Sequence, residues 1–232
     1  LFGKDDCLDD WKSMQEIHVL LDRLPELNTI VREKLGHMLQ TVTLTHREDG
    51  QQKVVVGNTH LFFHPMASHI RLLQLFACFH RMQVERQGMY PVIFCGDLNS
   101  SPSSGAARLF FDREVAPTCG VTDKGTTWKH LHTFAWDRAY TDPSTVPTDV
   151  PELPTIRLEE SFPILCSGYP QLPIYTHYIQ NFAATLDYIL VSHGAFRPVA
   201  SAAMPSEEVL TEHVAMPSEV LPSDHVCLVC DL

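Results

Sequence analysis

The stretch Pro91-Val92-Ile93-Phe94-Cys95-Gly96-Asp97-Leu98-Asn99-Ser100 decides the fold, because an apolar strand ends there in a turn that carries a carboxylate and a carboxamide. Alternate residues of a strand point to the same side, so we expect Asp97 and Asn99 to lie together. A carboxylate can accept a proton while a carboxamide donates hydrogen bonds to a developing negative charge. Taken alone, Gly-Asp at a strand end is more typical of a simple chain reversal.

Three further strings place histidine, aspartate or both at the edge of a predicted strand. They are Gly57-Asn58-Thr59-His60-Leu61, Thr185-Leu186-Asp187-Tyr188-Ile189 and Pro222-Ser223-Asp224-His225-Val226. Singly, each has a structural alternative: Asp224 can cap the turn, Asp187 can pair with an arginine, and His60 can be a buried, hydrogen-bonded histidine. Together, the four strings favour a catalytic sheet edge.

In that order, the four strings resemble the exonuclease, endonuclease and phosphatase superfamily, whose members cleave phosphodiester bonds with Mg²⁺ at the edge of two packed β-sheets. The stretches 58–65, 70–72 and 204–225 look most like its 2′-phosphodiesterase branch. That branch cuts 2′,5′-linked oligoadenylate, trims poly(A) and works in the mitochondrial matrix. Its nearest relatives are deadenylases of the carbon catabolite repression type. The resemblance runs from about Val54 to Leu232, with a weak middle at 112–175.

The resemblance implies in-line attack of water on a phosphodiester. Asp97 would be the general base, with Asn99 helping to orient the water and the phosphate. His60 and His225 would donate to the nonbridging oxygens, where charge grows in the transition state. Asp187 would hold His225 in the donating tautomer.

The resemblance also implies a metal ion, Mg²⁺ or alternatively Mn²⁺, because carboxylate and amide oxygens suit hard cations. Asp224 would be a metal ligand together with Asp97 and Asn99. The substrate-binding residues would be Asn58, Phe63, His64 and Arg71. For Phe63, stacking on a base competes with packing, and for Arg71, a phosphate contact competes with holding the nearby loop. Zinc at His60 and His64 is disfavoured, since strand and Pro65 surround the pair.

One departure affects the metal site. Members of the superfamily carry an Asn at a strand end and then a Leu-Gln-Glu string whose glutamate binds Mg²⁺ directly, and this chain has neither. Met14-Gln15-Glu16 lies within a helical pattern, so the metal role does not transfer to Glu16. We therefore expect an N-terminally incomplete copy of the domain, with an unpaired sheet edge and exposed apolar surface.

Composition agrees with one globular domain over 1–232, since 44% of the 232 residues are hydrophobic and can bury a core. No apolar run approaches the roughly 20 residues that span a bilayer, and the first residues are typical of neither a signal nor a transit peptide. We expect no membrane association and no obligate protein partner. A net charge of −11 argues against broad electrostatic capture of nucleic acid.

The seven cysteines lie in apolar settings typical of reduced core thiols. Cys227 and Cys230 form a C-x-x-C spacing, but they lie in a predicted strand with no second pair, so core packing is favoured over zinc. Asn99-Ser100-Ser101 fits a glycosylation sequon by chance.

The fold class expected is α/β, a four-layer sandwich of two mainly antiparallel sheets with helices outside. Apolar spacing predicts a helix from Trp11 to Leu24 and another from Leu27 to Leu39, followed by strands at 42–44 and 53–57 joined by a Gly50 turn. Further helices are predicted at 68–83 and after Ser101. From 112 to 175 the prolines predict a loop-rich insertion, with disorder at 141–154.

Three hypotheses of function follow. The first is a 2′,5′-phosphodiesterase and 3′-exoribonuclease that acts on short oligoadenylate and on RNA 3′ ends, in the mitochondrial matrix. The second is a cytoplasmic poly(A) deadenylase that prefers 3′,5′ linkages. The third is a catalytically inactive product that binds a nucleotide or a partner, supported by the missing glutamate. Among the active alternatives, the tail around Met204 favours the first.

Overall fold

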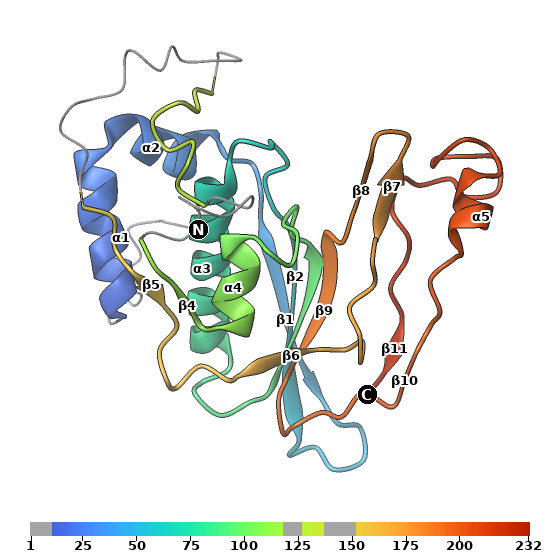
Figure 1. The fold of residues 1–232 in the computed structure, drawn as a ribbon. Coiled ribbons are helices and arrows are strands. Elements are labelled where there is room, and N and C mark those ends of the chain that lie inside the picture. Colours follow the sequence, from blue (N-terminus) through green and yellow to red (C-terminus); the bar gives the residue numbers. More distant parts are fainter. Residues whose placement is uncertain (1–10, 118–126, 137–151) are drawn as a thin grey trace.

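A computed structural model describes residues 11–117, 127–136 and 152–232. Its centre is a five-stranded sheet with the order β1-β2-β3-β9-β6 and helices stacked on one face (Figure 1). The strands are β1 (Leu39–Thr45), β2 (Lys53–His60), β3 (Val92–Asp97), β9 (Asp187–Ser192) and β6 (Leu165–Ser167). Only β2 and β3 pair in parallel within this sheet. This mixed sheet with flanking helices confirms the α/β class.

The β1–β2 hairpin matches the predicted turn. Gly50 has a φ of 67°, in the left-handed region that glycine tolerates without a steric cost. Both strands are longer than predicted, and β1 begins at Leu39, which apolar spacing had assigned to a helix. That part of the prediction was wrong, since the helical segment ends at Lys34 and the chain turns extended at Leu35.

The helix α3 (Ser68–Glu85) connects the parallel strands β2 and β3, as a parallel pair requires. The predicted helix at 68–83 is therefore confirmed. It is buried on nearly all sides, because α1 (Lys12–Arg23) covers the face that the sheet leaves free. Trp11, just before α1, packs edge-on against Phe76 of α3 with ring centroids 5.5 Å apart.

Pro25 interrupts the N-terminal helical region, as predicted. It occupies the first turn of α2 (Pro25–Thr29), which runs on into a π-helical turn η1 (Ile30–Lys34). Glu16 lies on α1 in contact with Lys12, 3.7 Å away. The Met14-Gln15-Glu16 string is thus helical, in agreement with the sequence-based interpretation.

The helix α4 (Gly105–Phe111) supports the turn that follows β3. The Ser104 hydroxyl caps it by accepting a hydrogen bond from the Ala107 N–H at 3.3 Å. Gly105 is required by packing, because a Cβ there would lie 1.7 Å from the Thr127 hydroxyl oxygen. The predicted unit of strand, turn and short helix is confirmed.

The proline-rich middle of the chain contributes more to the core than expected. It holds the short strands β4 (Glu114–Val115), β5 (Ile156–Arg157) and β6. Ile156 and Phe162 are buried in the main core, so the described residues 156–162 pack against the rest of the domain. Residues 118–126 and 137–151, which include most of the predicted disordered stretch, lie outside the described residues.

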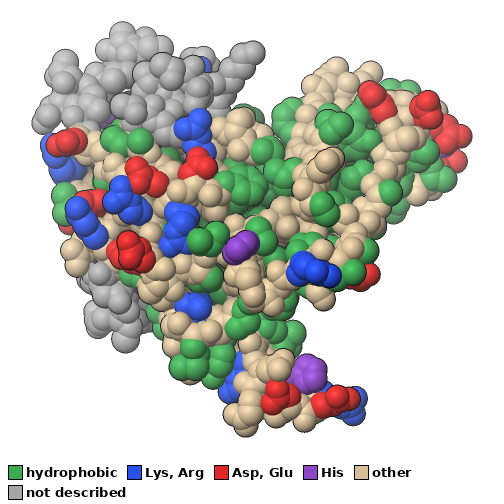
Figure 2. Space-filling model, turned by 60° about the horizontal axis from the view of Figure 1, so that its bottom comes forward, with side chains coloured by type: hydrophobic (Ala, Val, Ile, Leu, Met, Phe, Trp, Pro, Cys, Tyr) green, Lys and Arg blue, Asp and Glu red, His purple; other side chains and the backbone are tan. Residues whose placement is uncertain are grey.

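The C-terminal segment lies on the opposite side of the sheet from α1–α4 (Figure 1). It contains the hairpin β7 (His177–Ile179) and β8 (Phe182–Ala184), the pair β10 (Ala200–Ser201) and β11 (Cys230–Asp231), and α5 (Glu207–Thr211). Figure 2 shows it standing out as an arm, with acidic side chains at the end formed by α5. A sandwich of four layers was expected. The described residues form the five-stranded sheet, the helical layer on one of its faces, and the two-stranded pairs β7–β8 and β10–β11 on the other face.

The strand predicted from Val226 onward is shorter than expected. Within it, only Cys230–Asp231 forms β11, and the Val226 N–H donates to the Thr176 carbonyl at 2.7 Å. Cys227 is consequently exposed, contrary to the prediction of a core thiol, whereas Cys78 is buried. The described cysteines are free thiols.

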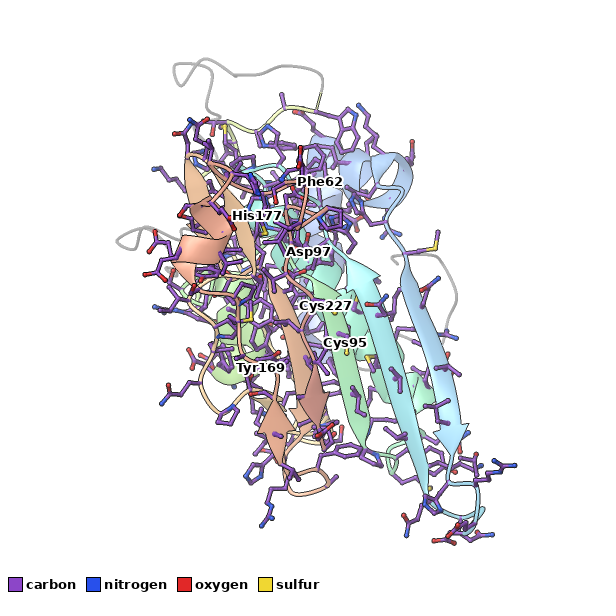
Figure 3. The ribbon with its side chains drawn as sticks, turned by 90° about the vertical axis from the view of Figure 1, so that its right-hand side faces the viewer. Phe62, Cys95, Asp97, Tyr169, His177 and Cys227 are labelled. Atoms are coloured by element: carbon purple, nitrogen blue, oxygen red, sulfur yellow. The ribbon has the colours of Figure 1, made fainter. Side chains whose placement is uncertain are left out.

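The sheet face turned away from the helices is only partly covered. In Figure 3 the strands β1, β2 and β3 face the viewer, and the C-terminal segment lies over their neighbours. Val42 and Leu44 of β1 are each 50% exposed on this side. β1 is an edge strand among the described residues and carries no charged side chain. Within the same ranges, we find no helix long and apolar enough to cross a membrane.

Candidate active site

The predicted catalytic residues meet where β2 and β3 end and β9 begins. His60 and Asp97 are register partners at the last positions of the parallel pair β2–β3. Asp97 is in turn the direct partner of Asp187 across the antiparallel pair β3–β9. The sheet therefore brings three of the four sequence strings to one edge, where Figure 3 labels Asp97.

Asp97 is the centre of this edge, and its side chain is only 15% exposed. One carboxylate oxygen, Oδ1, accepts a hydrogen bond from the Asn99 N–H at 2.8 Å. The other, Oδ2, lies 3.4 Å from His60 Nε2 and 3.7 Å from His225 Nε2. The carboxylate thus keeps one oxygen between two imidazoles.

Burial raises the pKa of Asp97 above its usual value, and the charge of Asp187 acts in the same direction. The Asn99 N–H and the two histidines oppose this rise by stabilising the ionised form. The net upward shift makes Asp97 a stronger base than an exposed aspartate, as a general base requires.

Asn99 locks the turn after β3. It has a positive φ of 46°, a conformation that asparagine tolerates, and its amide donates to the Leu61 carbonyl at 2.9 Å. The Leu61 N–H in turn donates to the Asp97 carbonyl at 2.9 Å. The two strand ends are therefore tied together. The amide oxygen of Asn99 has no hydrogen-bond partner within the described residues.

The close approach of β3 to β2 requires a glycine at position 96. Its φ is 145°, and a Cβ at this position would lie 1.9 Å from the Thr59 carbonyl oxygen. No side chain fits between the two backbones. The absence of a Cβ lets β3 approach β2 closely enough to place Asp97 beside His60.

His225 and Asp187 form a hydrogen-bonded pair. The His225 Nδ1 lies 2.8 Å from the Asp187 Oδ2, which leaves Nε2 on the side of Asp97. Burial lowers the pKa of His225, but the hydrogen bond to Asp187 and the charges of Asp187, Asp97 and Asp224 outweigh it and raise the pKa overall. His225 is therefore favoured as a cation, a form in which both nitrogens donate.

Thr176 positions Asp187. Its hydroxyl donates to the Asp187 Oδ2 at 2.6 Å and accepts from the N–H groups of Leu186 and Asp187 at 2.9 and 3.0 Å. The hydroxyl thus uses its donor and both acceptor sites on the start of β9. This arrangement fixes the rotamer of the carboxylate that holds His225.

A second imidazole and carboxylate pair lies beside the first. His177 Nε2 is 3.3 Å from the Asp224 Oδ2, and the ring centroids of His177 and His225 are 4.7 Å apart. His177 is buried, and its Nδ1 has no hydrogen-bond partner among the described residues. Asp224 is half exposed at the mouth of the site.

Two groups of side chains have the spacing of metal ligands. In the described ranges, one donor atom each from Asp97, Asp187 and His225 lie within 4.8 Å of one another, as do donor atoms from His177, Asp224 and His225. The first group offers two carboxylates and an imidazole, beside the unpartnered amide oxygen of Asn99. Such a donor set fits a divalent cation.

The predicted substrate-binding residues divide by exposure. Phe63 is 68% exposed and Asn58 is exposed, so both are accessible to a ligand. His64 accepts a hydrogen bond from the Met66 N–H at 3.2 Å and stacks on Phe62 at 6.2 Å. His64 therefore lies in an aromatic cluster behind Phe63.

Arg71 is placed differently. It is buried, and its Nη1 donates to the carbonyls of Phe62 at 3.1 Å and His64 at 2.6 Å. Burial lowers the pKa of Arg71 to about 10, against the opposing effect of the Asp97 charge. This position favours the structural alternative, in which Arg71 holds the loop that follows His60.

Sequence reasoning missed Thr176, His177 and His37. Thr176 and His177 begin a short hairpin directly after the proline-rich stretch, and only their pairing with 224–226 brings them to the site. His37 sits in the break between the last helical turn and β1, and it lies near His60 with ring centroids 6.3 Å apart. No periodicity in the sequence marks any of the three.

Comparison with known proteins identifies the family. Residues 9–225 match the model of the Endonuclease/Exonuclease/phosphatase family. The chain is 31% identical over 224 residues to 2′,5′-phosphodiesterase 12 of Rattus norvegicus and 29% identical over 204 residues to that of Homo sapiens. These matches cover 92% and 84% of this chain but 32% and 28% of those proteins, so the chain spans about a third of their length.

Among solved structures, the fold resembles that of ANGEL2, described as a 2′,3′-cyclic phosphatase. The TM-score is 0.58 at 20% identity, over 83% of this chain and 65% of that one. At this identity the likeness concerns the fold alone. The family match, which covers nearly the whole chain, supports a hydrolytic activity of the phosphodiesterase or nuclease kind. The chain therefore belongs to the endonuclease/exonuclease/phosphatase family.

Proposed function

We propose that the chain hydrolyses phosphodiester bonds of short 2′,5′-linked oligoadenylate, and of poly(A) 3′ ends, to release AMP. The observation that carries this proposal is the line of Asp187, His225 and Asp97, with 2.8 Å and 3.7 Å between successive partners. A cationic imidazole beside a base of raised pKa is suited to attack on a phosphodiester.

Asp97 is the general base of the proposed reaction. Its Oδ2 accepts the proton of the attacking water, while Oδ1 stays fixed by the Asn99 N–H. Because burial raises its pKa, the proton transfer is more favourable than to an exposed carboxylate.

His225 and His60 are the donors to the phosphate. His225 has its Nδ1 engaged by Asp187, so Nε2 is the nitrogen that reaches the substrate. His60 is 67% exposed at the end of β2, beside the same Asp97 oxygen, and would donate to the same phosphate. Two donors on a nonbridging oxygen stabilise the charge that grows there.

A divalent cation is part of the proposal. Asp97, Asn99 and Asp224 would hold Mg²⁺ or Mn²⁺, and the ion would neutralise phosphate charge and stabilise the leaving oxyanion. In support, Asp97 and Asp224 each belong to one of the two groups of side chains with the spacing of metal ligands.

The net charge of the chain favours a short oligonucleotide as the substrate. With a net charge of −11, the chain has few cations for a long nucleic acid backbone. A short oligonucleotide held by two histidines and a metal avoids that repulsion. The similarity to 2′,5′-phosphodiesterase 12 supports the 2′,5′ linkage. Adenylate as the substrate and the mitochondrial matrix as the compartment are proposed from the sequence resemblance of the stretch 204–225.

One observation favours a second candidate, in which the chain binds nucleotide without turnover. Within the given sequence no Leu-Gln-Glu string occurs, and Glu16 lies on α1 and not at a strand end, so the described residues offer no such glutamate to a metal. A poly(A) deadenylase with 3′,5′ preference is the remaining alternative, and the linkage test below separates it.

The test incubates the purified chain with Mg²⁺ or Mn²⁺ and equal amounts of 2′,5′- and 3′,5′-linked triadenylate, following AMP release. Asp97→Asn should abolish release, because the amide cannot accept the proton. The matched control is Asp49→Asn, the same change in the exposed hairpin turn far from the site. Faster cleavage of the 2′,5′ substrate supports the proposal, faster cleavage of the 3′,5′ substrate supports the deadenylase, and binding without release supports the inactive binder.

A further inference from the structure

A hollow opens beside Asp97, on the β1 side of the sheet edge. It has a volume of about 450 Å³. Its lining includes His37, Met38, Gln40, Asn58, His60 and Asp97. Since Asp97 and His60 belong to the proposed catalytic group, whatever occupies this hollow touches the atoms next to the scissile bond.

We propose that this hollow binds the uncharged nucleoside on the far side of the scissile phosphate, through His37, Gln40 and Asn58. The inference rests on the proposed function, because it names where the second nucleotide of the substrate lies. It assigns three neutral side chains to recognition of a base and its ribose, and it leaves the phosphate to His60 and His225.

The charge of the lining favours a neutral ligand. No lysine or arginine belongs to the lining that the described residues form, and Asp97 is a carboxylate. A second phosphate would therefore find no lysine or arginine in the lining to pair with. A nucleobase or ribose instead needs donors and acceptors together, which carboxamides and a neutral imidazole provide.

His37 has an unsatisfied polar atom in this region. Its Nδ1 is buried and has no hydrogen-bond partner among the described residues. Burial lowers the pKa of His37 and the proximity of His60 lowers it further, so the ring is neutral at physiological pH. A neutral ring offers one donor and one acceptor for hydrogen bonds to a base or ribose.

The segment that carries His37 is fixed in place. The Thr59 hydroxyl donates to the Met38 carbonyl at 3.0 Å and so attaches the segment to β2. The ring of His37 also packs edge-on against Phe62, with centroids 5.7 Å apart. A binding group held on both sides loses little entropy when a ligand arrives.

The two carboxamides lie side by side. Gln40 and Asn58 are cross-strand partners in β1–β2, and both side chains are exposed on the same face of the sheet. Paired amides of this kind can bind the edge of adenine, which presents an acceptor next to a donor. Met38, 65% exposed at the same rim, offers an apolar contact for the face of the base.

The test measures binding without turnover. One ligand is the 2′,5′-linked diadenosine dinucleotide with a hydrolysis-resistant phosphorothioate bridge, and the second is the same compound lacking the base on the nucleoside assigned to the hollow. Calorimetric titration of the intact chain should show at least about fivefold tighter binding of the complete ligand. In His37→Ala and in Gln40→Ala, this preference should shrink towards one.

The matched control is Gln51→Ala, which removes the same side chain from the turn at the other end of the β1–β2 hairpin. It should keep the full preference. Circular dichroism checks that each variant is folded. Gln40→Ala should not affect folding, because Gln40 is exposed on an edge strand, so it tests the hollow even if His37→Ala is unstable. A wild-type chain that binds both ligands equally, or variants that keep the wild-type preference, would overturn the inference.

Inorganic phosphate is the third probe. If His37→Ala weakens phosphate binding as much as dinucleotide binding, the hollow recognises the phosphate and the inference is wrong. Turnover is recorded separately on the unmodified dinucleotide. If the chain prefers the complete ligand but does not hydrolyse the dinucleotide, the proposed function is refuted and the hollow remains a nucleoside site. If the chain hydrolyses the dinucleotide but shows no base preference, the proposed function stands and the inference about the hollow is refuted.

Discussion

Asp97 and Asp187 face each other directly across β3 and β9, and His225 lies between their carboxylates. Like charges at opposite positions of an antiparallel pair destabilise a sheet unless something neutralises them. His225 does so with a nitrogen 2.8 Å from one carboxylate and 3.7 Å from the other. Burial, together with the charge of Asp187, raises the pKa of Asp97, whereas the hydrogen bond to Asp187 and the neighbouring carboxylates raise the pKa of His225 against its burial. The protonation states of Asp97 and His225 therefore depend on each other.

The first prediction concerns pH. Asp97 must be ionised and His225 protonated, so kcat/KM should follow a bell whose acid limb lies above 3.8 and whose basic limb lies above 6.5, the usual values of the two groups. Asp187→Asn should move the basic limb down, because it removes the hydrogen bond and charge that raise the pKa of His225. Rates from pH 3 to 10 at fixed ionic strength check this, and an unmoved basic limb would exclude His225 as its source.

Stability should follow a related course. The folded pKa of His225 is raised, so the protonated imidazole stabilises the fold at pH below about 6.5, the value expected of the unfolded chain. That contribution is lost as the pH rises through the higher pKa of the folded state. Urea unfolding at several pH values should show a loss in this window that His225→Asn abolishes.

The second prediction concerns Thr176. Thr176→Val keeps the shape but removes the hydroxyl that donates to Asp187 and accepts from two backbone N–H groups. We expect a loss of about 1–3 kcal/mol in the free energy of unfolding. Because Asp187 then no longer fixes His225, kcat should fall by about tenfold to a hundredfold. Thr176→Ser, which restores the hydroxyl, should recover both, and equal damage by valine and serine would disprove the hydroxyl's role.

The third prediction concerns the approach of β2 and β3. Gly96→Ala places a methyl group 1.9 Å from the Thr59 carbonyl oxygen and should cost about 3 kcal/mol or more in the free energy of unfolding. Gly50→Ala is the matched control, since Gly50 also has a positive φ but nothing within 4 Å of the new Cβ. Its cost should be about 1 kcal/mol. Similar values for the two would mean that the close approach is unimportant.

The fourth prediction separates the two roles considered for Arg71. If it holds the loop after His60, Arg71→Lys should lower the melting temperature, because one ammonium cannot serve the carbonyls of Phe62 and His64 and two hydroxyls at once. A substrate contact would instead raise KM at unchanged melting temperature. Differential scanning fluorimetry beside a KM measurement decides between them.

The sheet edge was predictable from local sequence. The string 91–100 contains an apolar strand, a glycine and two polar residues after it, so its geometry depends mainly on neighbours in the chain. The strand ends at Asp97, however, and Asn99 has a positive φ of 46°, so the alternation expected to place the two side chains on one side does not extend to Asn99. The turn at Gly50 and the helix after Ser68 were predictable for the same reason. His60 and Asp97 then meet because parallel strands end at one edge.

Other parts depend on contacts distant in sequence. Leu39 continues a helical spacing of apolar residues, yet pairing with Thr59 makes it the first residue of β1. Residues 226–229 form a continuous apolar run typical of a strand, but the N–H groups of Val226 and Val229 donate to the Thr176 carbonyl and the Tyr169 hydroxyl and not to a neighbouring strand. His177 reaches the site through that same pairing. Local patterns carry no information on such partners.

The uncharged edge of β1 and the half-covered sheet face beside it have a consequence for handling this protein. Strands without charged residues at an open edge readily add a further strand from another molecule. We therefore expect soluble material to disappear with a rate that rises with the square of concentration, as a bimolecular process does, well below the temperature at which the core melts. Thr43→Lys places a charge midway along β1 and should slow that loss. It should not change the rate of hydrolysis, because Thr43 pairs with Val55, away from the end of β2 that carries His60.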